Sequence, residues 1–264
     1  MGTRNINLIQ IYRICGIILI LSILVKFSPS ILIYGNENLK FIFLSFFKIL
    51  LIVITIFWLQ KYNKLNKKFY LKNSGYFFFI SIILIFYVVH SNENFIETQE
   101  SFKNLKHSFF LLYYLSVGIF EELFFRVLIF GLLFKYFGEK NKFKAVLFCS
   151  LIFALFHLVN LFDSQFVKIS IINQVLYAFA VGLIFQSLLI KLNNIILISV
   201  IHGLLNYRSM FGSEFVKLND ISDVPYDYNQ FFLTFILFIS FILIIALPVS
   251  YFSSKDISNK IFCR

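Results

Sequence analysis

Residues 108–135 read SFFLLYYLSVGIFEELFFRVLIFGLLFK, and this stretch decides the class of the protein. It is long and apolar enough to span a bilayer as a helix, yet Glu121, Glu122 and Arg126 stand inside it. The rest of the 264-residue chain is similar: 59% of its residues are hydrophobic, 14% are charged, and the mean hydropathy is +0.84. Because a soluble domain carries about a quarter charged residues, the sequence predicts a membrane protein.

Apolar runs of spanning length recur along the chain and predict an all-α bundle of about eight transmembrane helices. Each span must be helical, because lipid offers no hydrogen-bond partner to an open backbone. The runs cover residues 7–26, 41–60, 75–90, 108–135, 144–162, 169–190, 194–211 and 230–251. We divide the chain into N-terminal spans (1–107), a core (108–211), and an external loop with the last helix and a cytoplasmic tail (212–264).

The distribution of charge predicts the orientation in the membrane. The net charge of +11 comes from 24 Lys and Arg against 13 Asp and Glu. With eight spans, one side holds fourteen cations and two acids, and the other holds seven cations and nine acids. Since cytoplasmic loops carry the excess of Lys and Arg, we expect a multi-pass cell-membrane protein with both termini in the cytoplasm. This placement explains the basic charge without a nucleic-acid partner, and the bias toward Phe, Ile, Lys and Asn favours a bacterial source.

Some polar side chains receive a purely structural interpretation. Arg13 and Lys48 fall inside predicted spans but near their ends, so their long side chains can reach the membrane surface. The three cysteines, Cys15, Cys149 and Cys263, are too few and too scattered for a disulfide framework or a metal ribbon. The first two lie in apolar segments, where a small buried thiol is expected.

Glu121 and Glu122 need a stronger explanation, because a carboxylate inside the bilayer is costly and marks a functional residue by default. An ion pair accounts for Glu122 and Arg126, which are four residues apart with the acid first. It leaves Glu121 without a partner on its own helix, about 100° around the axis from Glu122. We therefore interpret the pair of acids as functional.

Two histidines and an asparagine on later spans lie at a matching depth. His202 and Asn206 share a helix face one turn apart, while His157 stands alone; taken singly, such residues commonly hydrogen-bond between membrane helices. Counted from the nearest cytoplasmic lysine at about 1.5 Å per residue, Glu121, His157, His202 and Asn206 lie about 21, 20, 17 and 23 Å deep. Four polar groups on three helices share one layer, which predicts a common site.

The chemistry of this group points to hydrolysis. A carboxylate and an imidazole can together deprotonate a water, and a second histidine with an asparagine can donate hydrogen bonds to an oxyanion. These groups predict cleavage of an acyl bond, most simply a peptide bond inside the bilayer. The sequence has no Gly-x-Ser-x-Gly, His-Glu-x-x-His or phosphate-loop motif that would support a serine enzyme, a zincin or an ATPase.

Three motifs on successive predicted helices resemble those of the CAAX prenyl-protease and bacteriocin-processing family, which includes the type II CAAX prenyl endopeptidases. In chain order they are Glu121-Glu122-x-x-x-Arg126, Phe153-x-x-x-His157 and His202-x-x-x-Asn206. The resemblance covers residues 108–211, with no departure at a motif position. It implies a Glu-dependent intramembrane endopeptidase that acts on a peptide or lipidated protein, in CAAX-type processing or in maturation of a bacteriocin or other peptide.

The resemblance also implies a role for each motif residue. Glu121 is the base that works with His157 on the water, and His202 with Asn206 forms the oxyanion hole. Glu122 supports the base, as does the arginine of the first motif, Arg126. No cofactor is required in this scheme.

Three alternatives stay open. The family has been described as metalloproteases, and Glu121, His157 and His202 would make a three-ligand zinc site with an open position. We rank zinc second, because Arg126 disfavours a cation and Asn206 suits an oxyanion better. The resemblance also permits a non-catalytic bacteriocin self-immunity or scaffold protein. An ion-coupled transporter ranks lowest, since no inverted repeat or paired Gly- or Pro-interrupted span is present.

Overall fold

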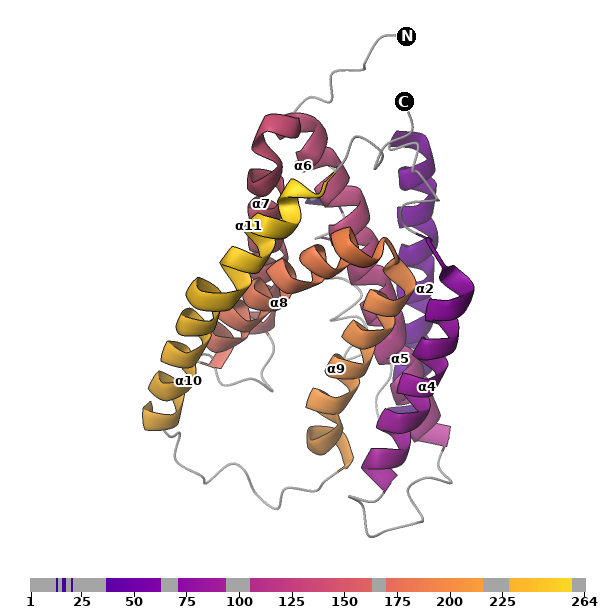
Figure 1. Cartoon of the computed structure of the whole chain (residues 1–264). Coiled ribbons are helices and arrows are strands. Elements are labelled where there is room, and N and C mark those ends of the chain that lie inside the picture. Colours follow the sequence, from indigo (N-terminus) through magenta and orange to yellow (C-terminus); the bar gives the residue numbers. More distant parts are fainter. Residues whose placement is uncertain are drawn as a thin grey trace. The chain divides into compact units, whose positions relative to one another are not determined.

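The computed structural model describes residues 13, 16–17, 20, 37–62, 71–93, 105–162, 170–215 and 228–257. These residues are almost entirely helical and include no β-strand beyond one isolated bridge between Leu71 and Asn194. The helices divide into two compact units (Figure 1). Unit 1 comprises residues 1–19, 125–193 and 220–264, and unit 2 comprises residues 20–124 and 194–219.

The described helices confirm an apolar, all-helical membrane protein. Four segments are long and apolar enough to cross a bilayer, namely Leu39–Phe57, Glu139–Phe162, Ser170–Leu192 and Tyr228–Lys255. Ser74–Val88 and Ile195–Ser209 are shorter apolar helices, and most of the predicted run 7–26 lies outside the described residues. The number of about eight spans, the orientation and the three-part division of the chain stay predictions.

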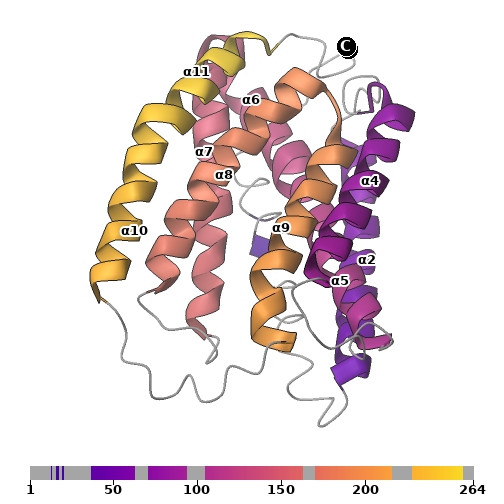
Figure 2. The ribbon, with the colours of Figure 1, turned by 60° about the horizontal axis from the view of Figure 1, so that its bottom comes forward.

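Unit 2 is built around α5. Its helices are α2 (Glu37–Tyr62), α4 (Ser74–Glu93), α5 (Leu105–Glu121) and α9 (Ile195–Phe215). Helix α5 packs against both α2 and α9, and α9 also packs against α4 (Figure 2). The ring of Phe110 on α5 lies 5.2 Å from that of Phe41 on α2 and 5.6 Å from that of Tyr207 on α9. These three buried aromatic residues join the helices that carry the acids and His202.

Asn194 fixes the start of α9. Its Oδ1 accepts a hydrogen bond from the Leu197 backbone nitrogen at 3.1 Å, which satisfies a donor of the first turn. Its Nδ2 donates to the Lys72 carbonyl oxygen at 2.9 Å and thereby ties α9 to the residues before α4.

Unit 1 is organised around α8. Its helices are α6 (Phe130–Phe137), α7 (Lys142–Phe156), α8 (Ser170–Leu192), α10 (Tyr228–Phe241) and α11 (Leu247–Lys255), with a π-helical turn, η6 (Ile242–Ala246), between the last two. Helix α8 packs against α7, α10 and α11. Helix α10 exposes large apolar side chains such as Leu233, Ile236 and Leu237, the surface that a spanning helix presents to lipid.

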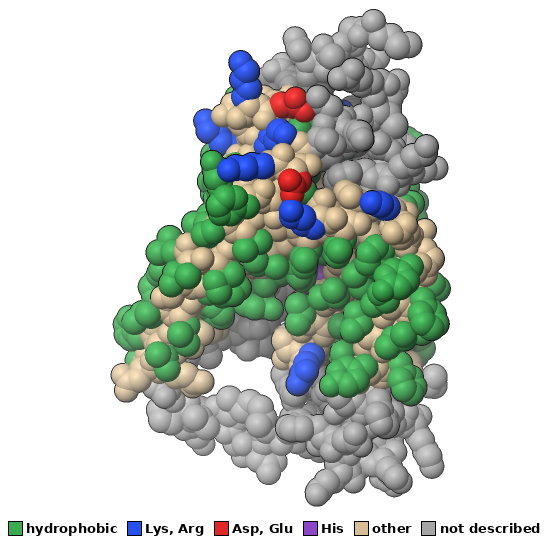
Figure 3. All heavy atoms as spheres, in the orientation of Figure 1, with side chains coloured by type: hydrophobic (Ala, Val, Ile, Leu, Met, Phe, Trp, Pro, Cys, Tyr) green, Lys and Arg blue, Asp and Glu red, His purple; other side chains and the backbone are tan. Residues whose placement is uncertain are grey.

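The exposed charges of unit 1 gather at one end. Figure 3 shows Lys and Arg side chains near the ends of α6 and α11, next to a wide apolar surface. At this end Lys191 forms an ion pair with Asp256, and the Lys142 ammonium donates to the Ile257 carbonyl oxygen.

The first motif lies where α5 gives way to a π-helix. The backbone is π-helical from Glu122 to Ile129, and the α-helix resumes at Phe130. The wider π-helical turn changes the spacing that the sequence analysis assumed for Glu122 and Arg126, and such segments are frequent at functional sites. The buried Cys149 thiol of α7 donates to the Phe125 carbonyl oxygen of this segment at 3.1 Å. The prediction of a small buried thiol is thus confirmed for Cys149.

Candidate functional site

Two glycines let α5 and α9 approach at backbone distance. A Cβ atom at Gly118 would lie 2.5 Å from both the Gly203 nitrogen and the Ser199 carbonyl oxygen. A Cβ atom at Gly203 would lie 2.8 Å from a backbone atom of α5. Small residues allow this close approach between membrane helices, and no side chain fits here. Because Gly118 lies one turn before Glu121 and Gly203 directly follows His202, the crossing sets the distance between the acids and the histidine.

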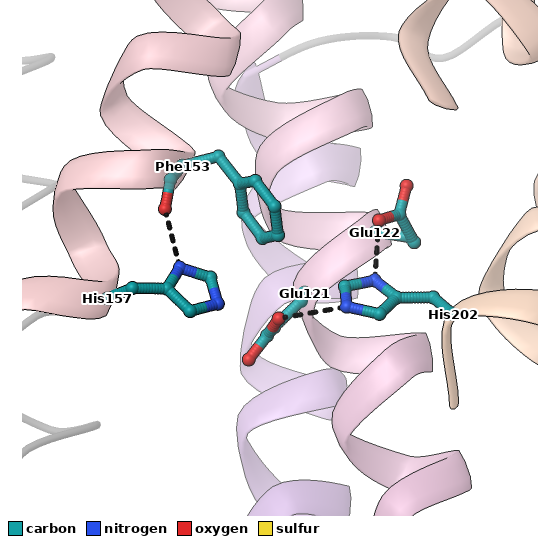
Figure 4. A network of polar contacts seen from close by, with 5 residues as sticks. All are labelled: Glu121, Glu122, Phe153, His157 and His202. Atoms are coloured by element: carbon teal, nitrogen blue, oxygen red, sulfur yellow. Dashed lines mark hydrogen bonds and ion pairs between the residues drawn. The ribbon is translucent and has the colours of Figure 1, made fainter. Parts of the chain in front are cut away.

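His202 lies between the two acids of the first motif (Figure 4). Its Nδ1 is 2.7 Å from Glu122 Oε1, and its Nε2 is 3.5 Å from Glu121 Oε2. All three residues are buried, with exposed fractions of 4% for His202, 8% for Glu121 and 0% for Glu122. Since a carboxylate oxygen accepts, Nδ1 of His202 is the donor in the shorter contact.

The two contacts of His202 differ in kind. The contact with Glu122 is a short hydrogen bond that fixes the orientation of the ring. The contact with Glu121 is longer than an ordinary hydrogen bond. The geometry therefore fixes the Nδ1 side of the imidazole and leaves Nε2 in a longer contact with Glu121.

Phe153 connects two other predicted site residues within unit 1. The Arg126 guanidinium carbon lies 4.5 Å from the centre of the Phe153 ring, and Arg126 is fully buried. The His157 ring lies 5.0 Å from the same ring, nearly perpendicular to it, and His157 Nδ1 is 3.0 Å from the Phe153 carbonyl oxygen (Figure 4). Sequence reasoning gave Phe153 no role of its own, although its spacing of four residues from His157 puts both on one helix face.

The bond to Phe153 also determines the tautomer of neutral His157. A carbonyl oxygen only accepts, so Nδ1 carries the hydrogen and the lone pair of the neutral ring lies on Nε2. His157 begins a 3-10 segment, η4 (His157–Phe162), at the end of α7 and is half-buried. Its Nε2 has the electronic character of a proton acceptor or a metal ligand.

Asn206 and Lys48 are the remaining polar residues of interest in unit 2. Asn206 lies one turn after His202 on α9 and is half-buried. Lys48 is only 8% exposed, and its ammonium lies 4.8 Å from the centre of the Phe120 ring. The prediction that Lys48 reaches the membrane surface is wrong, because it lies on the face of α2 that packs against α5.

The fit to zinc is partial. The Nε2 atom of His202 and the Glu121 oxygen, 3.5 Å apart, have a separation that two ligands of one tetrahedral zinc ion can adopt at about 2.0–2.2 Å each. Within the part of the chain that the structure describes, no group of three or more His, Cys, Asp or Glu side chains is placed to hold a metal ion. These residues would supply two ligands, and zinc stays the alternative.

Comparison with known proteins identifies the region that holds the motifs. Residues 103–208 match the family model described as Rce1-like, type II CAAX prenyl endopeptidase Rce1-like. The comparisons with curated proteins and with solved structures gave no match. The match contains all six predicted site residues, Glu121, Glu122, Arg126, His157, His202 and Asn206. The resemblance to the CAAX prenyl-protease and bacteriocin-processing family is therefore confirmed over residues 103–208, where this membrane protein is similar to the type II CAAX prenyl endopeptidases.

Proposed function

We propose that the protein is an intramembrane endopeptidase that hydrolyses a peptide bond in a membrane-associated or lipidated substrate. The observation that carries the proposal is the position of His202 between Glu121 and Glu122, in a domain that matches a protease family. Two buried carboxylates beside an imidazole are costly to keep in a membrane protein and are suited to proton transfer. A structural contact between helices would need only one of the acids.

In the proposed reaction, Glu121 acts with His157 to take a proton from a water whose oxygen attacks the peptide carbonyl carbon. The carbonyl oxygen becomes an oxyanion, to which His202 and Asn206 donate hydrogen bonds. The C–N bond then breaks, and the proton taken from the water passes to the leaving amine. His202 donates from both ring nitrogens when it is an imidazolium.

The contacts of the chain support a positioning role for two further residues and an electrostatic role for a third. Glu122 holds the His202 ring through the 2.7 Å bond at Nδ1. Phe153 contacts Arg126 with its ring and His157 with both its ring and its carbonyl oxygen. We propose that Glu122 and Phe153 fix the orientation of the two histidines, while Arg126 supplies a buried positive charge to the site.

The substrate follows from the family description. Its type II CAAX prenyl endopeptidases are named for prenylated substrates. We propose a prenylated peptide or protein for this chain, with maturation of a bacteriocin or other peptide as the second candidate. Both place the scissile bond at the membrane, where the apolar helices of this protein lie.

Comparison of protein termini in membranes tests the proposal. Cells would carry the wild type, Glu121→Gln, or the control Glu139→Gln, which changes an exposed acid after α6, at equal expression. We expect termini that occur with the wild type and the control but not with Glu121→Gln. Identical termini in all three strains, with Glu121→Gln still complementing a deletion phenotype, would overturn proteolysis and favour a scaffold or immunity protein. Proton flux that depends on Glu121 without cleavage would favour a transporter.

A further inference from the structure

Lys48 lies in the middle of the buried face of α2. The buried residues of this helix follow the helical period along one face and are Phe41, Leu44, Ser45, Lys48, Leu51, Thr55 and Leu59. The opposite face exposes large apolar side chains such as Phe46, Val53 and Phe57. This periodicity orients Lys48 toward the helices of unit 2 that pack on α2, of which α5 is the main one.

The position along α2 excludes contact of the ammonium with water at either helix end. Lys48 is 11 residues from Glu37 (48 − 37) and 14 from Tyr62 (62 − 48). These separations are about 17 and 21 Å along the helix, well beyond the reach of a four-carbon stem. The positive charge therefore needs compensation near the buried end of the side chain.

The acids that can compensate this charge are those of the first motif. Among the residues of unit 2 whose exposure the structure describes, Glu121 and Glu122 are the buried acids. The Lys48 ammonium lies 4.8 Å from the ring of Phe120, the residue immediately before Glu121, so it is at the turn of α5 that carries the acids. Two adjacent carboxylates repel each other, and a nearby cation offsets that repulsion.

We propose that Lys48 supplies the counter-charge of the Glu121–Glu122 pair and is thereby a positioning residue of the site. It comes from a helix outside the region that matches the family model, residues 103–208. The charge pairing does not depend on the reaction that the site performs, whereas its effect on turnover rests on the proposed function.

A double-mutant cycle on thermal unfolding tests the pairing without an activity assay. The variants are Lys48→Met, Glu121→Gln, Glu122→Gln and the two doubles that contain Lys48→Met, each in lipid nanodiscs. Breaking a buried pair leaves a charge without compensation, so we expect Lys48→Met to lower the Tm by about 6 °C or more. We expect at least one double variant to recover half of that loss, since it removes the partner charge as well.

Lys40→Met is the matched control. Lys40 lies on the same helix with its ammonium 5.8 Å from the Phe41 ring, but it is half-buried near the start of α2. Its effect on the Tm should add to that of either glutamate substitution. Strictly additive effects for Lys48→Met with both glutamate variants would overturn the proposal. If Lys48→Met does not fold, folding of either double variant supports the pairing, and failure of both overturns it.

Kinetics separate a positioning role from a purely structural one. We expect Lys48→Met to lower kcat about tenfold or more while KM changes less than twofold, and we expect Lys48→Arg, which keeps the charge, to recover most of the loss. A Lys48→Arg variant as impaired as Lys48→Met at equal folded amounts would overturn the role of the charge. A wild type without proteolysis would contradict the proposed function but leave the result of the unfolding cycle intact.

Discussion

His202 Nδ1 lies 2.7 Å from Glu122 Oε1 and joins α9 to the first residue of the π-helical segment. The two residues are 80 positions apart in the chain, and both side chains are buried. The bond therefore fixes the imidazole ring through tertiary structure, and it does so at the place where α5 loses its α-helical spacing. Substitutions around this contact should therefore lower the activity of the site more than they lower the stability of the fold.

Glu122 should stabilise the fold through the hydrogen bond that it accepts from His202. Glu122→Gln keeps an oxygen that can accept from His202 Nδ1, whereas Glu122→Leu leaves that buried donor without this acceptor. We expect Glu122→Leu to cost about 1.5–3 kcal/mol of unfolding free energy and Glu122→Gln clearly less, measured by denaturant unfolding in detergent. Equal losses would mean that the hydrogen bond does not stabilise the fold.

The glycine crossing should tolerate no side chain. Gly118→Ala and Gly203→Ala place a methyl group within 2.8 Å of backbone, which we expect to cost about 1–3 kcal/mol or more and to separate His202 from the acids. Loss of cleavage should exceed the loss of folded protein. Gly75→Ala on α4 is the control, because a Cβ there meets nothing within 4 Å. A Gly118→Ala variant with wild-type activity would show that the close approach is not needed.

Phe153→Leu should reduce activity without unfolding the protein. Leucine keeps most of the apolar volume but loses the ring that lies 4.5 Å from the Arg126 guanidinium. Without the ring Arg126 can shift, and because misplacement of a site group lowers the rate we expect cleavage to fall by about tenfold or more. Phe156→Leu is the control variant. Phe156 lies three residues after Phe153 on α7, and its ring lies 5.5 Å from that of Phe125. Equal activity of the two variants would show that the Phe153 ring has no specific role in cleavage.

Chelation distinguishes the proposed reaction from the zinc alternative. We expect purified protein to keep its activity after prolonged dialysis against a strong chelator, because the scheme requires no metal. Loss of activity that zinc restores would instead favour the zinc alternative, in which Glu121, His157 and His202 would hold the metal and the metal would activate the water. The zinc content of the same samples would show whether restored activity rises in proportion to the zinc bound per protein molecule.

Hydropathy alone identified the membrane class and several helices, because apolar length and composition are local properties of the chain. The runs 41–60, 144–162, 169–190 and 230–251 each overlap a described segment long enough to span a bilayer. The motif spacing also selected the histidine and the acids that meet in unit 2. The prediction for Lys48 failed because it rested on the distance of the residue from a span end. The direction of its side chain depends instead on the face of α2 on which it lies, and that face is buried.

The sequence by itself determined that this is a helical membrane protein with acids, histidines and an asparagine in the motif order of a protease family, since charge inside an apolar run is visible without a structure. Only the tertiary structure decided that His202 lies between Glu121 and Glu122. It also revealed the contact of Phe153 with Arg126 and the π-helical turn at Glu122. The physical reason is that the contacts of His202 with the acids depend on the backbone distance between α5 and α9 at Gly118 and Gly203, and residues far apart in the chain set that distance together.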